Sequence, residues 1–125
     1  MARTPENLIQ REIMAALGAE PDLILFRNSV GSVPMYHHAT GRTYHVTFGL
    51  GVGSPDIVGI LRVELPGRTL GQWFCLEVKR PGEHPRPEQE QCAQAWRRFG
   101  AFVAIVTSVG EARAAFMRAR KGEHS

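Results

Sequence analysis

The chain has 125 residues, the usual size of one domain, so a second independent hydrophobic core is not expected. A composition of 43% hydrophobic and 22% charged residues is typical of a globular protein and excludes the disordered and fibrous classes. The fifteen Lys and Arg residues exceed the twelve Asp and Glu residues and give a net charge of +3, which modestly favours a polyanionic partner.

The N-terminal segment predicts a helix followed by a buried strand. Thr4 is a suitable N-cap, Pro5 a suitable first-turn residue and Glu6 an early acid. Apolar residues then recur at helical spacing, so we expect a helix over residues 5–17, ended by the glycine that follows it. The short apolar run at residues 23–28 predicts a buried strand.

The middle of the chain predicts further strands. Residues 31–53 contain five glycines and a Tyr, His and Thr-rich alternation, which predict a loop or hairpin with strand character near residues 44–48. Two β-rich runs, residues 56–65 and 72–80, flank the turn signal Pro66-Gly67-Arg68, so we predict neighbouring antiparallel strands. Because both runs are apolar at odd and even positions, helices are expected to cover the sheet, which makes the fold class α/β.

The C-terminal part continues this alternation. It predicts a helix over residues 87–99, a strand over residues 101–108 and a helix over residues 110–120. We therefore expect a single domain over residues 1–120, followed by a polar tail at 121–125 that frays.

The cysteines and the apolar segments bear on location. Cys75 and Cys92 are too few for a disulfide framework and have no zinc-ligand spacing, so both are expected to be buried, reduced thiols. No stretch approaches the roughly 18 apolar residues of a membrane span, and the N-terminus has no secretory pattern. We expect no membrane partner and an intracellular, cytoplasmic location.

Two helical positions carry a polar residue where an apolar one belongs. Glu6 falls in the middle of the apolar stripe of the first helix, and Gln89 lies on the apolar face of the helix at residues 87–99. Each has an ordinary explanation, because a first-turn acid is favoured by the helix dipole and a first-turn glutamine can cap the helix. A role in a site is the alternative for both.

Three ionisable residues are predicted to gather at the ends of two strands. Glu77 and Lys79 are two residues apart, so they project from one face of their strand. Asp56 precedes Gly67 by about as many residues as Glu77 follows it, so antiparallel pairing brings Asp56 next to Glu77 and Lys79. A structural salt bridge is one explanation of the cluster, because buried charges are usually paired.

The cluster also has a chemical use. Two carboxylates and a nearby backbone carbonyl are hard oxygen ligands of the kind that suits Mg²⁺ or Mn²⁺. Such an ion lowers the pKa of a bound water, and an adjacent lysine can orient that water and stabilise charge on a phosphate. These residue types therefore suit phosphodiester hydrolysis.

Pro55-Asp56 followed by Glu77-Val78-Lys79 resembles the signature of the PD-(D/E)XK nuclease superfamily. The surrounding segments narrow the resemblance to the VRR-NUC branch. They are GSPDIVG at residues 53–59, EVKRPG at 77–82, PEQ at 87–89, GAFVAIVTS at 100–108, ENLIQ at 6–10 and FRNSVG at 26–31. The likeness covers nearly the whole chain. Where the family is named for valine-arginine-arginine, this sequence has Val78, Lys79 and Arg80, and lysine is the usual residue at the catalytic position.

The resemblance implies a fold and a set of roles. The fold is restriction-endonuclease-like, with an αβββαβ core whose central mixed sheet is flanked by helices. The implied catalytic residues are Asp56, Glu77, Lys79 and Gln89. The implied metal ligands are Asp56, Glu77, the backbone carbonyl of Val78 and Glu6, which can act directly or through water.

The resemblance also implies an activity. Small stand-alone members, from phages and bacteria, resemble Holliday junction resolvases, so we expect a Mg²⁺- or Mn²⁺-dependent DNA endonuclease that acts on branched DNA as a homodimer. A flap- or end-processing nuclease and a non-catalytic DNA-binding module of the same fold are the alternatives. A hydrolase of small phosphorylated molecules would need a closed pocket.

Several residues near the cluster are candidate DNA contacts. They are Arg27, Asn28, Ser54 and Arg80, with Arg42 and Arg86 on loops predicted to flank the site. A solvated surface arginine is the alternative for each arginine.

Two further patterns suggest other chemistry. The glycine-rich run at residues 49–54 is not followed by a predicted helix, so a dinucleotide loop is not indicated and we expect a close backbone approach beside Asp56. His37, His38 and His45 lack accompanying Cys or acidic spacing for zinc, so we expect loop or DNA-facing histidines.

Overall fold

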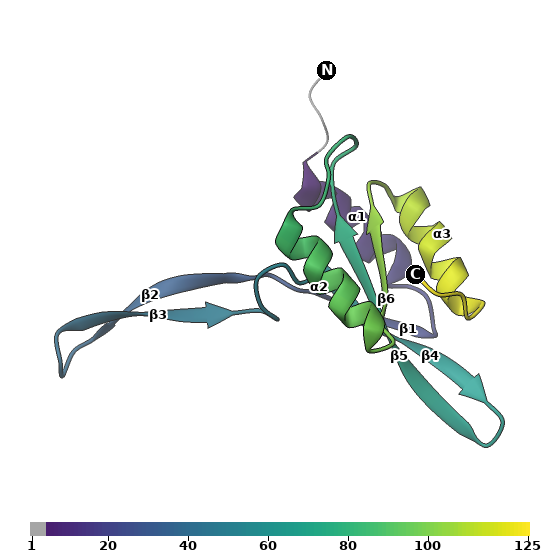
Figure 1. The fold of residues 1–125 in the computed structure, drawn as a ribbon, viewed down its shortest axis with the longest axis horizontal. Coiled ribbons are helices and arrows are strands. Elements are labelled where there is room, and N and C mark those ends of the chain that lie inside the picture. Colours follow the sequence, from purple (N-terminus) through teal and green to yellow (C-terminus); the bar gives the residue numbers. More distant parts are fainter. Residues whose placement is uncertain (1–4) are drawn as a thin grey trace.

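The computed structural model describes residues 5–125, so the predicted N-cap Thr4 lies outside the described residues. The elements follow one another as in Figure 1. They are α1 (Glu6–Leu17), β1 (Leu23–Arg27), β2 (Gly31–His37), β3 (Arg42–Phe48), β4 (Ile57–Leu65), β5 (Arg68–Val78), α2 (Pro87–Arg98), β6 (Phe102–Val106) and α3 (Val109–Arg120).

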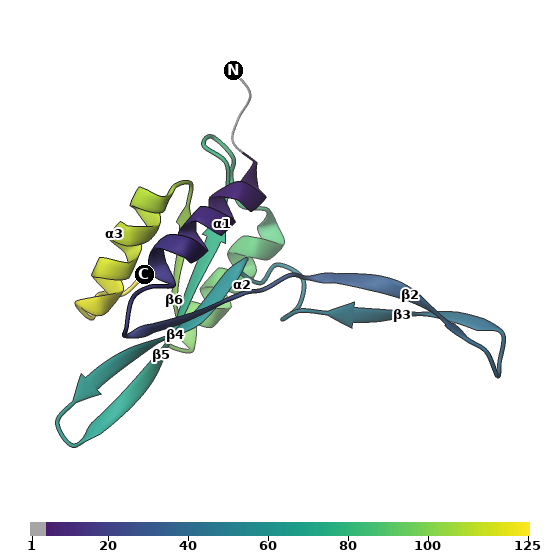
Figure 2. The ribbon, with the colours of Figure 1, turned by 180° about the vertical axis from the view of Figure 1, so that it is seen from behind.

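The central sheet is mixed and has the strand order β1-β4-β5-β6. β1, β4 and β5 pair antiparallel, whereas β6 lies parallel to β5. α1 and α3 cover one face of the sheet and α2 covers the other, as the two opposite views show (Figures 1 and 2). The predicted α/β class and αβββαβ order are confirmed, with the hairpin β2–β3 inserted between the first two core strands.

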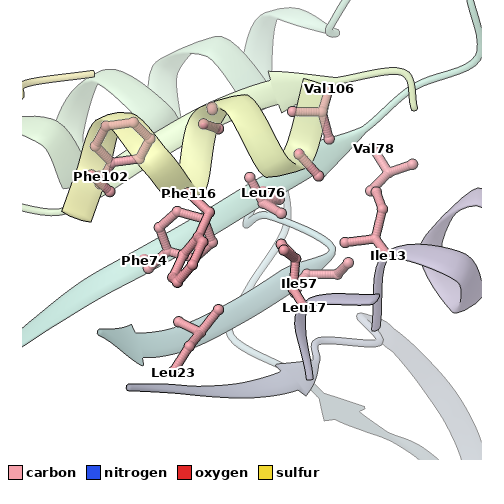
Figure 3. Packing of buried hydrophobic residues seen from close by; sticks show 14 of the residues in the cluster. Ile13, Leu17, Leu23, Ile57, Phe74, Leu76, Val78, Phe102, Val106 and Phe116 are labelled. Atoms are coloured by element: carbon pink, nitrogen blue, oxygen red, sulfur yellow. The ribbon is translucent and has the colours of Figure 1, made fainter. Parts of the chain in front are cut away.

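The main core lies between the sheet and the pair α1 and α3. Three phenylalanines meet there: the Phe74 ring stacks on Phe102 at a centroid distance of 5.7 Å and meets Phe116 edge-on at 6.0 Å (Figure 3). All three are at most 2% exposed, and each such side chain stabilises the fold by about 1.5–3 kcal/mol. This core holds rigid the strand ends that carry the polar cluster.

α1 follows the predicted spacing. Ile9, Ile13 and Leu17 are its buried residues, and the helix ends before Gly18. Pro5 is the N-cap rather than the first helical residue, and its carbonyl accepts a hydrogen bond from the N–H of Ile9 at 3.2 Å. The first turn of α1 is thereby closed at its N-terminus.

β4 and β5 form a longer hairpin than the sequence predicted. Leu65 pairs with Arg68 across a two-residue turn, in which Gly67 has φ 79°. A proline followed by a glycine with positive φ is typical of a type II turn, which lets pairing continue up to the turn. β5 therefore begins at Arg68 rather than at residue 72, and its first residues are exposed.

The hairpin β2–β3 extends away from the body as an arm (Figures 1 and 2). Strand character was expected only near residues 44–48, yet seven residues of each strand pair, from Gly31 with Phe48 to His37 with Arg42. Every residue of the two strands except Gly31 is exposed. The arm thus contributes nothing to the core.

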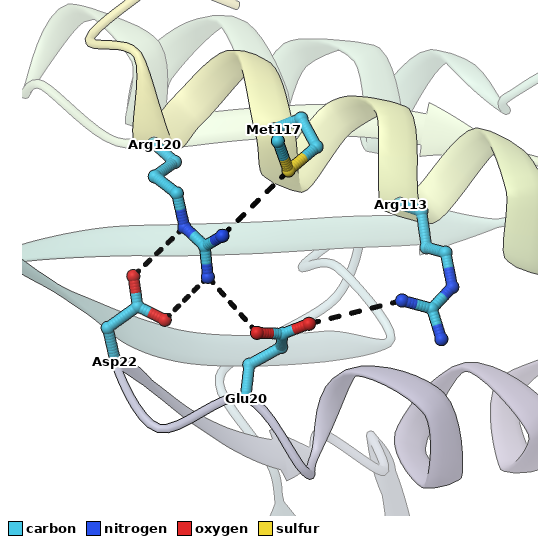
Figure 4. Close-up of polar contacts among 5 residues, drawn as sticks. All are labelled: Glu20, Asp22, Arg113, Met117 and Arg120. Carbon is cyan, nitrogen blue, oxygen red and sulfur yellow. Dashed lines mark hydrogen bonds and ion pairs between the residues drawn. The ribbon is translucent and has the colours of Figure 1, made fainter.

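α3 is attached to the start of β1 by Arg120. Its guanidinium donates hydrogen bonds to both oxygens of Asp22, at 2.8 and 3.1 Å, and to Glu20 at 3.1 Å (Figure 4). The guanidinium also lies over the Phe116 ring, 4.3 Å from its centroid. These contacts join segments almost one hundred residues apart.

The C-terminal tail differs from the prediction of a frayed end. The hydroxyl of Ser125 accepts hydrogen bonds from the N–H of Val103 at 2.9 Å and from Nε of Arg97 at 3.3 Å. Val103 belongs to β6, whose outer edge pairs with no further strand of the sheet among the described residues, so the tail occupies a free N–H of that edge.

The structure bears on two further expectations, the burial of the cysteines and the absence of a membrane-spanning segment. Cys75 is buried and Cys92 is half-buried, and both are free thiols. Within residues 5–125, no helix has the length and apolar character that crossing a membrane requires.

Candidate active site

Asp56 and Glu77 lie side by side at the ends of two neighbouring strands. Ile57 pairs with Leu76, so the next pair along the same register is Asp56 with Glu77, as the count about Gly67 predicted. Oδ2 of Asp56 accepts a hydrogen bond from the N–H of Val78 at 2.8 Å. This bond holds the Asp56 carboxylate in place beside β5.

Glu77 is an acid in an apolar setting, with 3% of its surface exposed. Burial is the main cause that raises its pKa from 4.5 to about 9, followed by the hydrogen bond and charge of Asp56, while Lys79 acts in the opposite direction. Without a cation, burial and the adjacent Asp56 therefore favour the neutral form of Glu77, because two adjacent carboxylates repel each other.

Gln89 connects α2 to this pair. Its Nε2 donates to Oε1 of Glu77 at 3.0 Å, and its Oε1 accepts from the N–H of Arg86 at 2.8 Å. The second bond caps the first turn of α2, and the first orients the Glu77 carboxyl group. The capping explanation is confirmed for this side chain, and its role in a site stays a prediction.

Lys79 is buried beside Glu77, with 6% of its surface exposed. Its N–H donates to the carbonyl of Val106 at 2.9 Å, which fixes the backbone just beyond the end of β5. The ion pairs within 4 Å that residues 5–125 form do not include the Lys79 ammonium. A closed salt bridge therefore does not explain the cluster in the described part of the chain.

Glu6 approaches the same cluster from the other face of the sheet. It is half-buried in the first turn of α1, and partial burial raises its pKa. The nearest charges that act on its pKa are those of Lys79, Glu83 and Asp56, in that order of effect. α1 and α2 thus each direct one polar side chain toward the strand ends.

Asn28 holds the loop that leads into Asp56. Its Nδ2 donates to Oγ of Ser54 at 2.7 Å and to the carbonyl of Pro55 at 2.8 Å, and its Oδ1 accepts from the N–H of Leu50 at 3.0 Å. The backbone N–H of Asn28 also donates to the carbonyl of Asp56 at 2.7 Å. Asn28 was predicted as a substrate contact, and these bonds engage both hydrogens of its amide.

The glycine-rich loop makes the close backbone approach expected of it. Gly53 has φ 84°, and a Cβ there would lie 2.4 Å from the carbonyl oxygen of Glu88 in α2. Ser54 is buried, and its hydroxyl donates to the carbonyl of Gly51 at 2.6 Å. The loop therefore packs directly on the start of α2, and Ser54 serves its internal hydrogen bonding.

A polar cavity of about 530 Å³ adjoins the carboxylate pair. Its lining joins Asp56 and Gln89 to two arginines, Arg27 from the end of β1 and Arg86 from the loop before α2. Arg27 also donates to Oε1 of Gln10 at 2.9 Å. Gln10 was not singled out from the sequence, although it lies one helical turn after Glu6 on the same face.

The other two arginines do not line this cavity. Arg80 forms an ion pair with Glu83. Arg42 lies near the tip of the arm and not on a loop beside the site, because the segment before it is a full strand rather than a short loop (Figure 1). The position of Arg42 along the sequence did not indicate that the arm places it away from the site.

A larger and more apolar cavity, of about 630 Å³, lies at the far end of α2. It is lined by Trp73, Trp96 and Phe99 among others and contains none of the polar residues described above. The cavity at Asp56 is therefore the one associated with the ionisable groups.

The donor set at the strand ends fits a divalent cation of the magnesium type. It comprises the Asp56 and Glu77 carboxylates and the Val78 carbonyl, which points to the same side of β5 as the Val78 N–H that binds Asp56. A cation would also relieve the repulsion within the carboxylate pair. Among residues 5–125, no three His, Cys, Asp or Glu side chains are grouped as a preformed metal site.

Comparison with known proteins concerns the fold. No family model and no curated protein matches the sequence. A solved structure described as "VRR_NUC domain" is similar, with a TM-score of 0.56 and 21% sequence identity over 90% of this chain and 94% of that one. The chain therefore has the fold of a VRR_NUC domain, and the fold implied by the sequence resemblance is confirmed.

Proposed function

We propose that this chain is a metal-dependent DNA endonuclease. The observation that carries the proposal is the pair of Asp56 and Glu77 carboxyl groups, hydrogen-bonded at the ends of adjacent strands and accompanied by buried Lys79. A nuclease-type function also agrees with the fold that the chain shares with a VRR_NUC domain.

Each residue of the site has a role in the proposed reaction. Asp56, Glu77 and the Val78 carbonyl would hold Mg²⁺ or Mn²⁺, and the bound ion would supply a water of lowered pKa. Lys79 places its positive charge where the phosphate becomes more negative, and it orients the attacking water. Gln89 keeps the Glu77 carboxyl group in its ligating orientation.

Glu6 and the arginines complete the assignment. Glu6 would complete the metal site directly or through water, since the charges of Lys79 and Asp56 act on its pKa. Arg27 and Arg86 bind DNA phosphates in the cavity beside Asp56. Arg80, Asn28 and Ser54 remain candidate DNA contacts from the sequence resemblance.

The proposed substrate is branched DNA, cut by two copies of the chain in the manner of a Holliday junction resolvase. The polar, arginine-lined cavity supports a polyanionic substrate over a small phosphorylated molecule. The free thiols agree with a reducing compartment, and we place the reaction in the cytoplasm.

The test is a cleavage assay with a labelled four-way junction, a flap, single-stranded DNA and linear duplex. Each substrate is incubated with Mg²⁺, with Mn²⁺ and with EDTA, using wild type, Asp56→Asn, Lys79→Ala and the exposed control Arg113→Ala. Asp56→Asn and Lys79→Ala should reduce cleavage by about a hundredfold or more, and Arg113→Ala should not.

Each outcome decides between the candidate functions. Symmetric, metal-dependent nicks across the junction support a resolvase. If only flaps or ends are cut, the proposal of a nuclease stands and the proposal of branched DNA as its substrate fails. DNA binding without cleavage under either metal indicates a non-catalytic DNA-binding module.

A further inference from the structure

The arm leaves the body at the cavity beside Asp56. Gly31, the first residue of the arm, lines that cavity together with Asp56. Asn28 ties the two ends of the arm to the site, because its Oδ1 accepts from the N–H of Leu50 at 3.0 Å and its N–H donates to the carbonyl of Asp56 at 2.7 Å. The base of the arm is thereby fixed relative to the carboxylate pair.

The arm extends well beyond the site (Figures 1 and 2). Its register runs from Gly31 with Phe48 to His37 with Arg42, and the carbonyl of His37 accepts from the N–H of Gly41 at 2.8 Å to close the tip. At about 3.3 Å per residue, strands of this length reach roughly 23 Å. That reach corresponds to about seven base pairs of duplex DNA, at about 3.4 Å each.

The stretch of chain that contains the arm has no acidic residue. None of the twelve Asp and Glu residues falls between Asp22 and Asp56, whereas the stretch contains Arg27, Arg42 and three histidines. The ion pairs within 4 Å that form among residues 5–125 do not include Arg42. The arm therefore offers a polyanion a positive charge and no negative one.

The two faces of the arm differ in chemistry, because directly paired residues project from the same face. The apolar arm face is formed by Val33, Met35, Tyr44, Val46 and Phe48. The polar arm face is formed by Ser32, Pro34, Tyr36, Thr43, His45 and Thr47. Hydroxyl and imidazole groups on the polar arm face both donate and accept hydrogen bonds, as the edges of DNA bases do.

We propose that the arm is a β-ribbon that lies in the major groove of double-stranded DNA next to the cut, with its polar face toward the bases. The major groove, about 12 Å wide, admits a two-stranded ribbon of this kind. Arg42, in the last pair at the tip, contacts a phosphate at the far end of the ribbon. The substrate then needs about seven base pairs of duplex on the side of the cut where the arm lies.

The inference rests on the proposed function, because it specifies the DNA beside the proposed cleavage site. Its tests measure binding and not cleavage, so the two can fail separately. A chain that binds duplex DNA through the arm and never cuts it keeps the inference and removes the nuclease. A chain that cuts DNA with an arm that makes no contact does the reverse.

The first test compares the two faces of the arm by fluorescence anisotropy. All proteins carry Lys79→Ala, so that the labelled duplex of about 20 base pairs, longer than the arm can span, stays intact in Mg²⁺. His45→Glu should lower the affinity by about tenfold or more, because its charge faces the phosphates and bases. Val46→Glu introduces the same charge on the opposite face, and at about 0.15 M salt, where the Debye length is about 8 Å, it should lower affinity by about twofold or less.

The second test uses the salt dependence of binding. Arg42→Ala should reduce the slope of log affinity against log salt by about 1, because one phosphate contact is lost. Arg68→Ala is the matched control, since Arg68 is also an exposed arginine next to a hairpin turn, in the hairpin β4–β5 that points away from the arm (Figure 1). Arg68→Ala should leave the slope unchanged.

A tethered cutting reagent tests the position of the arm without changing its two faces. In a Cys92→Ser background, Ala39→Cys at the tip carries an iron–EDTA group that is activated with ascorbate and peroxide. It should cut bound duplex DNA within a few base pairs, whereas the same group on Arg68→Cys should not. Cys75 is buried and does not compete. Circular dichroism should show the same fold in every variant.

Four results would overturn the proposal. The first is a protein without measurable affinity for duplex DNA, and the second is one that binds single-stranded DNA as tightly as duplex. The third is an equal loss of affinity in His45→Glu and Val46→Glu, which would remove the distinction between the two faces. The fourth is DNA that the reagent on Ala39→Cys leaves uncut, which would place the duplex away from the arm.

Discussion

Gln89 donates a hydrogen bond to Glu77 at 3.0 Å while its amide oxygen caps the first turn of α2 through the N–H of Arg86. One side chain therefore links the start of a helix to the most buried acid of the site. Removing it should affect both the helix and the carboxylate pair.

Gln89→Ala should lower the free energy of unfolding by about 1 kcal/mol through loss of the cap. It should also raise the Mg²⁺ concentration that gives half-maximal cleavage by about tenfold or more, because Glu77 loses the group that orients it. Unfolding curves and a Mg²⁺ titration measure the two effects, with the exposed Gln91→Ala as the control. An unchanged titration would leave Gln89 as a helix cap alone.

Asn28→Ala should act on the position of Asp56 and not on DNA affinity. The substitution removes three hydrogen bonds that tie residues 50–55 to β1, and it should cost about 1–3 kcal/mol of stability. Because Asp56 follows that segment directly, kcat should fall while KM for DNA changes little. A rise in KM at constant kcat would instead support the prediction that Asn28 contacts DNA directly.

The carboxylate pair predicts a pH dependence of stability in EDTA. Burial raises the pKa of Glu77 in the folded chain from 4.5 to about 9, with the hydrogen bond and charge of Asp56 and the charge of Glu6 acting in the same direction and the charge of Lys79 against them. A raised pKa stabilises the fold below pH 4.5, and this contribution is lost as the pH rises toward 9. Urea unfolding at pH 5, 7 and 9 should show the decline.

Glu77→Gln is the matched variant for that experiment, because it keeps the shape of the side chain and cannot ionise. Its stability should vary much less over the same pH range. If wild type and Glu77→Gln decline in parallel, another group is responsible for the pH dependence.

Arg27 and Arg86 predict the salt dependence of DNA binding. Each phosphate contact releases a counterion, so replacing Arg86 with alanine should reduce the slope of log affinity against log salt by about 1. Arg27→Ala should act similarly, and Arg113→Ala on α3 should leave the slope unchanged. Equal slopes in all the variants would place the DNA outside this cavity.

The contact between Asp22 and Arg120 predicts a gain of stability above acidic pH. The Arg120 hydrogen bonds lower the pKa of Asp22 below 3.8, so the contact stabilises the fold above that pH and is lost as the pH falls through the lowered value. Asp22→Asn should be less stable than wild type by about 1 kcal/mol at pH 7.

The difference between Asp22→Asn and wild type should shrink between pH 7 and a pH below the lowered pKa of Asp22, because the wild-type carboxyl group is then neutral as well. Thermal unfolding at both pH values measures it, with the exposed Glu12→Gln as control. A difference of the same size at both pH values would assign it to packing and not to charge.

The strand register and the helical faces could be predicted because they depend on short-range rules. The turn at Gly67 fixes which residues pair, so Asp56 could be placed beside Glu77 by counting. The 3.6-residue period likewise placed Glu6 and Gln89 on the inner faces of their helices. The early start of β5 was missed, because residues 68–71 are exposed and Leu70 is the one large apolar residue among them, so they lack the apolar pattern of a strand.

The sequence by itself thus determined the α/β elements, the adjacency of the two carboxyl groups and the resemblance to a nuclease fold. Only the tertiary structure brought Gln10, Arg27 and Arg86 to one cavity, paired Arg80 with Glu83 and carried Arg42 away on the arm. These residues come from elements that are not neighbours along the chain, and their distances are set by how helices pack on the two faces of the sheet. Local periodicity carries no information on that packing.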